Sequence, residues 1–245
     1  MKIVIKVGSE TLVKMGGLNK AVMQPLVRQM AELILKGHQL IFVSSGAVAS
    51  GRKSDQTEDD MISKSRAAMR GQIKLMGFYS KQFGELGIDI AQALYTYKDL
   101  KENSEFIAVN LLRGFRYREV TIVNFNDGCA DTELIAMGVF GDNDPLSAML
   151  TIIVGADLLL ILTNVSGLWD GPPDKPGSEF ILEVKEVTPE ILETAFTDGM
   201  RKKIQAAQMV QAEGHTCVIA SGFEKDIITR IVEKKEKVGT WFLGK

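Results

Sequence analysis

The sequence predicts an α/β fold: a three-layer sandwich in which a mostly parallel central sheet lies between helices. Short apolar segments alternate with segments of helical periodicity along the 245 residues, which is typical of a parallel sheet covered by helices. The first segment, Ile3 to Val7, is apolar on both faces apart from Lys6, as expected of a strand buried on both sides. No linker rich in Gly, Ser or Pro divides the chain, so we expect one domain over residues 1–245 with two functional halves.

The first half of the chain predicts strands joined by helices and loops. Met23, Leu26 and Met30 open a helical periodicity that ends before Gly37, so a helix is expected after the first strand. The charged segment 52–64 is expected to be a solvated loop, followed by a long helix over roughly 64–86. Strands are expected at 3–7, 39–43, 88–95 and 120–124.

The second half repeats this alternation. Asp144 and Pro145 are expected to begin a helix, because aspartate is a preferred N-cap and proline suits the first helical position. A strongly apolar strand follows, and then a turn-rich loop at 167–177. Further helices are expected from 188, over about 199–213 and over 223–232, with strands at 158–163, 216–220 and 240–243.

Lys6 is the first candidate for chemistry. An ammonium group in a buried strand costs several kcal/mol unless it has an anionic partner. That partner is either a structural carboxylate or a bound anion, since open α/β sheets bind ligands at the carboxyl ends of their strands. Gly8 and Ser9 follow directly, offering a closely approachable backbone and a hydroxyl group. This combination favours phosphate, and the structural pairing stays open as the alternative.

Composition argues against several classes of function. A formal net charge of −2 is not that of a general nucleic-acid or membrane-surface binder. His38, His215, Cys129 and Cys217 lie in separate segments, which argues against a zinc site, a disulfide framework or a histidine-based triad. No apolar run reaches the length of about 18 residues that a membrane span needs. Because Lys6 also interrupts the amino-terminal apolar run, we expect a cytoplasmic protein without a signal peptide.

Three small-residue loops that follow strands are candidates for phosphate binding. The chain has neither Gly-x-x-x-x-Gly-Lys-Ser/Thr nor a Gly-x-Gly-x-x-Gly after a strand, which excludes a P-loop, a dinucleotide fingerprint and a protein-kinase glycine loop. Residues 8–9, 44–46 and 141–144 each offer backbone N–H groups next to a helix N-terminus. Each loop alone fits a strand-to-helix turn, but the three together with Lys6 favour a phosphate site.

Six segments of the chain resemble the amino acid kinase superfamily. They are 6–9, 43–49 (Val-Ser-Ser-Gly-Ala-Val-Ala), 124–127 (Asn-Phe-Asn-Asp), 140–148 (Phe-Gly-Asp-Asn-Asp-Pro-Leu-Ser-Ala), 156–168 and 197–203 (Thr-Asp-Gly-Met-Arg-Lys-Lys). The Gly-Asp-Asn-Asp turn followed by Leu-Ser-Ala after one residue is most like the glutamate 5-kinase branch. The resemblance implies the amino acid kinase (carbamate kinase-like) fold, with an acceptor-binding half at about 1–150 and a nucleotide-binding half at about 151–245. It also predicts a form without the carboxyl-terminal PUA module of many bacterial members.

The resemblance implies ATP-dependent phosphorylation of the γ-carboxylate of L-glutamate, the first step of proline biosynthesis. Lys6 and Lys203 would neutralise charge on the transferring phosphoryl group, and Asp144 would hold both lysines. The acceptor would bind to Ser45, Gly46, Asp127 and Asn143. The nucleotide would bind to Gly8, Ser9, Thr163, Asn164, Thr197, Gly199, Met200 and Lys203.

The expected co-substrate is ATP, with Mg²⁺ bridging its phosphates and no metal ligand assigned on the protein. Backbone N–H groups of Gly8, Ser9 and Gly46 would line the phosphoryl path as donors. The other partners implied are small-molecule substrates and further copies of the chain, as a dimer or tetramer, with no nucleic acid and no membrane.

Several residues depart from the family pattern. Phe125 replaces a glutamate, Asn164 an aspartate and Asp198 a glycine. Asp131 lies at the customary distance before Asn143 and competes with Asp127 as the ligand of the substrate ammonium. These departures leave two alternatives open: an amino-acid sensor with little or no activity on the same fold, or a kinase for a related small carboxylic acid. The two retained lysines favour catalysis.

Overall fold

The computed structural model describes residues 1–53, 58–129, 142–172 and 175–244. Asp131 and Gly141, both named in the sequence predictions, lie outside these ranges. Within the described ranges, no helix is long and apolar enough to cross a membrane.

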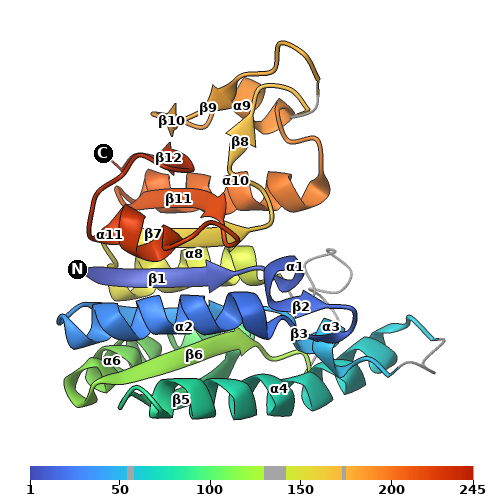
Figure 1. The fold of residues 1–245 in the computed structure, drawn as a ribbon, viewed down its shortest axis with the longest axis vertical. Coiled ribbons are helices and arrows are strands. Elements are labelled where there is room, and N and C mark those ends of the chain that lie inside the picture. The colour runs from blue at the N-terminus through green and yellow to red at the C-terminus, as the bar shows by residue number, and fades with distance from the viewer. Residues whose placement is uncertain (54–57, 130–141, 173–174, 245) are drawn as a thin grey trace.

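A central sheet runs through the molecule, and the described residues contribute eight strands to it (Figure 1). Its order is β10 (Glu183–Val184), β12 (Thr240–Phe242), β11 (Thr216–Ser221), β7 (Leu158–Thr163), β1 (Lys2–Val7), β4 (Gln39–Ser44), β6 (Glu119–Phe125) and β5 (Asp89–Tyr95). Neighbouring strands are parallel except β11 and β12, which are antiparallel. The predicted strands are confirmed to within about two residues, and β1 lies between β7 and β4, where both its faces are buried.

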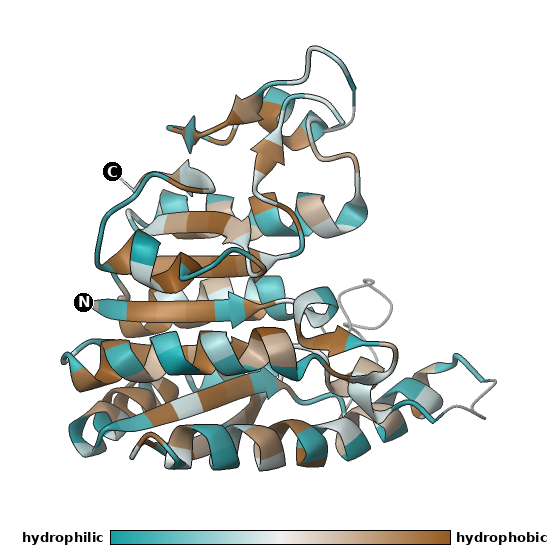
Figure 2. Cartoon of the chain, in the orientation of Figure 1, coloured by the Kyte–Doolittle hydropathy of each residue, from teal (hydrophilic) through white to brown (hydrophobic). Residues whose placement is uncertain are grey.

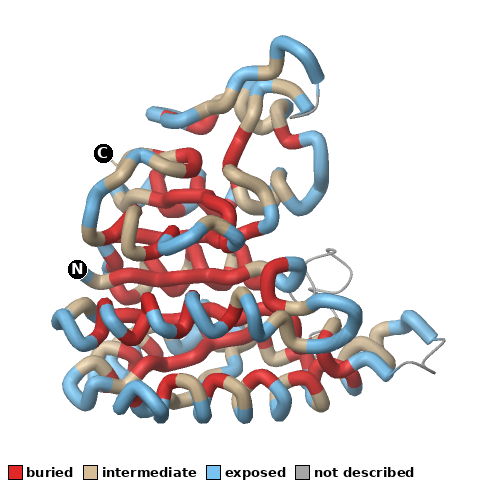
Figure 3. Tube along the Cα trace, viewed as in Figure 1, coloured by how far each residue is buried: buried red, intermediate tan, exposed pale blue. Residues whose placement is uncertain are grey.

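Helices cover both faces of the sheet and make the three layers. One face packs against α2 (Lys20–Leu35), α4 (Met61–Gly84) and α11 (Ile227–Val232). The other packs against α5 (Tyr97–Glu102), α6 (Ser104–Gly114), α8 (Asn143–Val154) and α10 (Asp198–Ala212). Figures 2 and 3 show the apolar, buried strands between these two layers. Alternation along β1 sends Ile5 and Val7 to the α2 side and therefore Lys6 to the α8 side.

The sequence patterns missed several elements, most of them short. Between β5 and β6, neither α5 nor α6 was predicted, and α4 begins at Met61 because Asp60 caps it by accepting from the Ser63 N–H. The region after β7 contains a hairpin of β8 (Leu168–Trp169) and β9 (Phe180–Ile181) at the top of Figure 1. The remaining short elements are α1 (Ser9–Leu12), β2 (Val13–Lys14), β3 (Gly17–Leu18), α3 (Ala47–Gly51), η1 (Phe115–Tyr117) and α9 (Pro189–Glu193).

The start of α8 corrects one prediction. Asp142 is its N-cap, and the Asp142 carboxylate accepts a hydrogen bond from the Asp144 N–H at 3.0 Å. Asp144 and Pro145 lie inside the first turn instead of at the cap. The helix begins two residues earlier than predicted because Asp142 satisfies the free N–H groups of that turn. The Asp144 side chain is thereby left for other contacts.

Two glycines let α3 and α4 touch through their backbones. A Cβ atom on Gly71 would overlap the carbonyl oxygen of Ala47, and one on Gly51 would overlap that of Ala67. This contact matters for function because α3 directly follows the Ser45–Gly46 turn.

Gly71→Ala is expected to lower the free energy of unfolding by about 3 kcal/mol, at the upper end of overpacking costs, because neither backbone can give way. Gly77→Ala is the matched control on the same helix: nothing lies within 4 Å of its Cβ position, so it should stabilise α4 by up to about 1 kcal/mol. Urea denaturation of both variants measures the difference. Equal stabilities would contradict the close approach.

Candidate active site

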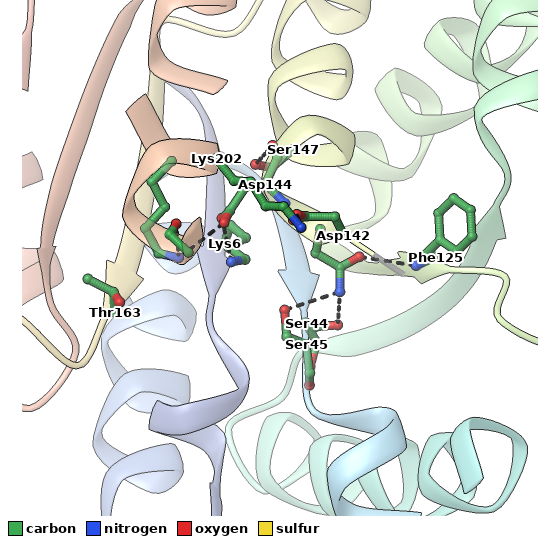
Figure 4. A network of polar contacts seen from close by, with 12 residues as sticks. Lys6, Ser44, Ser45, Phe125, Asp142, Asp144, Ser147, Thr163 and Lys202 are labelled. Atoms are coloured by element: carbon green, nitrogen blue, oxygen red, sulfur yellow. Dashed lines mark hydrogen bonds and ion pairs between the residues drawn. The ribbon is translucent and has the colours of Figure 1, made fainter. Parts of the chain in front are cut away.

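Two lysines from distant parts of the chain share one buried carboxylate. Lys6, near the end of β1, forms an ion pair with Asp144 Oδ1, and Lys203 Nζ lies 3.1 Å from Asp144 Oδ2. Lys203 also donates to the Gly199 carbonyl at 3.1 Å. The side chains of Lys6, Asp144 and Lys203 are 5%, 4% and 13% exposed. Figure 4 shows Lys6 and Asp144 facing each other at the junction of β1 and α8.

The charges of this triad do not cancel. Burial alone would raise the pKa of Asp144, but the ammonium groups of Lys6 and Lys203 outweigh it and hold that pKa below its usual value. The carboxylate is therefore ionised at neutral pH. Burial lowers the pKa of Lys6, and the neighbouring carboxylate of Asp144 opposes that effect. With both lysines protonated, two ammonium groups against one carboxylate give the triad one excess positive charge in a largely desolvated place, where it attracts an anion strongly.

A cavity of about 620 Å³ opens beside the triad. It is lined by Lys6, Asp144 and Lys203 and by every residue predicted to bind nucleotide: Gly8, Ser9, Thr163, Asn164, Thr197, Gly199 and Met200, besides Lys203. Ser45 and Asn143, predicted to bind the acceptor, line it too, whereas Gly46 and Asp127 do not. Cavities of roughly 300–1,000 Å³ are typical of small-molecule sites.

The acceptor end of the site is organised around Asn143. Its side-chain amide donates to Ser45 Oγ at 3.1 Å and to Asn124 Oδ1 at 2.8 Å, and its oxygen accepts from the Phe125 N–H at 3.2 Å. Figure 4 shows two sides of this network, Ser45 after the end of β4 and Phe125 at the end of β6. Asn143 thus joins three elements at the carboxyl edge of the sheet.

Two buried polar atoms near this network have no hydrogen-bond partner among the described residues: Asp127 Oδ1 and Asn124 Nδ2. Burial raises the pKa of Asp127 to about 6. Unsatisfied buried polar groups are rare and call for an explanation. A carboxylate oxygen and an amide N–H at the end of β6 are the groups that would pair with the ammonium and carboxylate of an amino acid.

The glycines of the predicted anion loops have different uses. Gly46 has φ of +91°, and a Cβ there would lie 3.0 Å from Val13 Cγ2, so the turn after Ser45 requires glycine. The Gly8 N–H donates to the Leu162 carbonyl at 2.9 Å. The prediction that this N–H lines the phosphoryl path as a donor is therefore wrong, because the sheet between β1 and β7 already uses it.

The nucleotide end of the cavity combines a helix N-terminus with an apolar wall. Thr197 caps α10 by accepting from the Met200 N–H at 3.1 Å, which directs the positive end of the helix dipole into the cavity. Trp169 and Phe196 contribute aromatic surface to the lining. The Trp169 ring packs edge-on against Phe180 at 5.4 Å.

Sequence reasoning missed Lys202 and Asp142 as individual residues of the site. Both line the cavity, and Lys202 Nζ lies 3.1 Å from Asp142 Oδ2. The signal was present in the sequence as two consecutive lysines and an Asp-x-Asp pattern. Nothing in the sequence told which lysine meets which aspartate.

The described residues contain no cluster of three or more acidic, histidine or cysteine side chains that could hold a metal ion. Mg²⁺ that is bound by nucleotide phosphates keeps several waters and needs few protein ligands.

The chain matches the model of the Amino acid kinase family over residues 1–221. It is similar to the protein named Glutamate 5-kinase of Dehalococcoides mccartyi (strain CBDB1), at 39% identity over 99% of this chain and 68% of that protein. The Glutamate 5-kinase of Desulfotalea psychrophila is 36% identical over 99% of this chain and 67% of its own length. The chain thus spans about two thirds of the length of these relatives.

Two solved structures share the fold at low sequence identity. UMP kinase from Ureaplasma parvum superposes with a TM-score of 0.71 at 16% identity, over 99% of this chain and 98% of that one. UMP kinase from Bacillus anthracis superposes with a TM-score of 0.73 at 12% identity, over 99% and 95%. At these identities the likeness concerns the fold alone.

Proposed function

This chain belongs to the amino acid kinase family, and on that basis we propose that it transfers the γ-phosphoryl group of ATP to the γ-carboxylate of L-glutamate. The product is glutamyl 5-phosphate, which opens proline biosynthesis. Relatives at 36–39% identity named Glutamate 5-kinase support this assignment. The observation that carries it is the convergence of Lys6 and Lys203 on Asp144 at the wall of one cavity.

The chemistry needs positioning and charge neutralisation more than proton transfer. One γ-carboxylate oxygen attacks the terminal phosphorus, and the bond from that phosphorus to the β–γ bridging oxygen breaks as ADP leaves with the electron pair. A carboxylate is already ionised at neutral pH, so no general base is required. Lys6 and Lys203 neutralise charge on the oxygens of the phosphoryl group during its transfer, and Asp144 keeps both ammonium groups within reach of that phosphoryl group.

When bound, Mg²⁺ supplies further neutralisation of the phosphate charge. In this site the ion would be held chiefly by the ATP phosphates. A cytoplasmic location and a homo-oligomeric state stay predictions from the sequence.

Asp127 would select a free amino acid. Its carboxylate is buried and has an oxygen without a partner among the described residues, so an ammonium ion satisfies it while an N-acylated substrate leaves it unpaired. Leaving such a charge buried and unpaired costs several kcal/mol. Glutamate is therefore favoured over acetylglutamate.

The affinity for glutamate is expected to fall as the pH falls through about 6. Burial raises the pKa of Asp127 to about 6, so below that pH the free protein holds a neutral carboxyl group that cannot pair with the ammonium. The glutamate KM should rise roughly tenfold between pH 7 and pH 5, while kcat at saturation changes little. Steady-state kinetics over this range in wild type and Asp127→Asn measure the effect; an Asp127→Asn enzyme with the same pH dependence would contradict it.

The function is tested by ATP consumption with hydroxylamine present to trap an acyl phosphate. Glutamate, aspartate, acetylglutamate and uridylate are compared. We expect ADP and hydroxamate to form in equal amounts with glutamate and at no comparable rate with the others. Hydroxamate formed preferentially from another acid would reassign the acceptor, and glutamate binding without ATP consumption would establish a sensor in place of a kinase.

A further inference from the structure

Lys202 forms a second bridge beside the one made by Lys203. Its ammonium group lies 3.1 Å from Asp142 Oδ2 and 3.6 Å from Asp198 Oδ2. Asp142 caps α8, while Asp198 and Lys202 belong to the first turns of α10. Consecutive lysines on α10 therefore pair with two aspartates, Asp142 and Asp144, at the start of α8. Figure 4 shows Lys202 and Asp142 next to Asp144.

The two bridges differ in exposure. The Lys203–Asp144 pair is buried, whereas the Lys202 side chain is 34% exposed and that of Asp142 12%. Burial alone would lower the pKa of Lys202, but its contacts with Asp142 and Asp198 outweigh this and raise it. The ammonium is thus charged at neutral pH, on the cavity wall.

Asp142 is held in place through both carboxylate oxygens and its backbone carbonyl. One carboxylate oxygen accepts from the Asp144 N–H at 3.0 Å, the other faces Lys202, and the carbonyl accepts from the Tyr97 hydroxyl at 3.0 Å. Because Asp142 begins the turn that contains Asn143 and Asp144, its position fixes theirs. A shift of about 1 Å in such groups can lower a rate by about 10²-fold.

We infer that Lys202 is a positioning residue that locks the acceptor half of the site to the nucleotide half. By pairing with Asp142, it holds the first turn of α8, with Asn143 and Asp144, against the first turns of α10, with Lys203. This inference rests on the proposed function, because its first test measures the turnover of glutamate and ATP. Without the ammonium, Asp142 Oδ2 faces the cavity without its cation. Of the two charged bridges between these helix ends, only the one through Lys203 is then left.

The test is a double-mutant cycle of Lys202→Met and Asp142→Asn, measured as kcat with glutamate and ATP both saturating. Methionine keeps the apolar stem of the lysine, and asparagine is a good N-cap, so α8 keeps its start. Each single variant should lose about tenfold in kcat. The kcat of the double variant should be no lower than that of the less active single variant. Lys202→Arg should recover kcat to within about threefold of wild type.

Arg201→Met is the matched control, because Arg201 is the exposed neighbour on the same helix, has no ion pair with another described residue and does not line the cavity. It should keep wild-type kcat. Wild-type kcat in Lys202→Met, or single losses that multiply, would overturn the inference. The inference would also be overturned if Lys202→Met changed only the KM for ATP and Asp142→Asn had wild-type kinetics.

A second readout does not depend on the reaction. Thermal unfolding without substrates is measured for the wild type, the two single variants and the double variant. The losses of thermal stability should be non-additive, because both substitutions break the same bridge. An inactive wild type would refute the proposed function, and the stability measurements would still show whether Lys202 and Asp142 are coupled. An active wild type with additive losses in both readouts refutes the inference alone.

Discussion

Replacing Lys203 with alanine is expected to lower turnover by roughly 10²–10³, the typical effect of removing one transition-state donor. Lys203 contacts Asp144 from α10, and its loss leaves the phosphoryl group with one ammonium in place of two. Asp144 keeps its ion pair with Lys6, so its buried carboxylate is not left without a cation and the variant should still fold. Binding of glutamate, which the proposal places at the other end of the cavity, should change modestly.

Turnover is measured with both substrates saturating, and glutamate binding is measured by calorimetry. Lys225→Ala is the control for loss of a lysine charge, because Lys225 is exposed and has no ion pair with another described residue. A Lys203→Ala enzyme with wild-type turnover would refute the catalytic role. The sensor alternative would be favoured if the wild-type protein bound glutamate without turnover and Lys203→Ala bound glutamate equally well.

Replacing Asp127 with alanine is expected to raise the glutamate KM by roughly 10²–10³ with little change in kcat. Pairing a buried carboxylate with an ammonium is worth about 3–4 kcal/mol when one partner is removed. The ammonium of glutamate is remote from the reacting γ-carboxylate and keeps its charge throughout the reaction, so its contact with Asp127 would be the same in the ground and transition states. A loss of such uniform binding appears in KM.

Two further variants sharpen this test. Asp127→Asn keeps the shape and removes the charge, so a KM close to that of Asp127→Ala would assign the effect to charge. Asp131→Ala removes the competing carboxylate, which lies outside the described residues. If Asp131→Ala raises the KM more than Asp127→Ala does, the ammonium ligand is Asp131.

The sequence patterns predicted most long elements well, with the 11-residue helix α6 as the exception, and short elements poorly. Strand β7 was predicted residue for residue because its five consecutive apolar residues, Leu158 to Leu162, are typical of a strand at the centre of a sheet. Helix α3 and the hairpin of β8 and β9 were missed because segments of two to five residues carry no measurable periodicity. The cap of α8 was displaced by two residues because Asp142 and Asp144 are equally good caps by type.

The sequence by itself determined the class of fold, the burial of Lys6 and the family, since these depend on local patterns and on motifs read along the chain. Only the tertiary structure decided which charges meet. Lys6, Asp144 and Lys203 converge because α8 and α10 pack against each other on the face of the sheet to which Lys6 of β1 points. The same packing uses the Gly8 N–H within the sheet and gives Lys202 its aspartate. Contacts between side chains so far apart in the chain depend on three-dimensional packing, which no local pattern records.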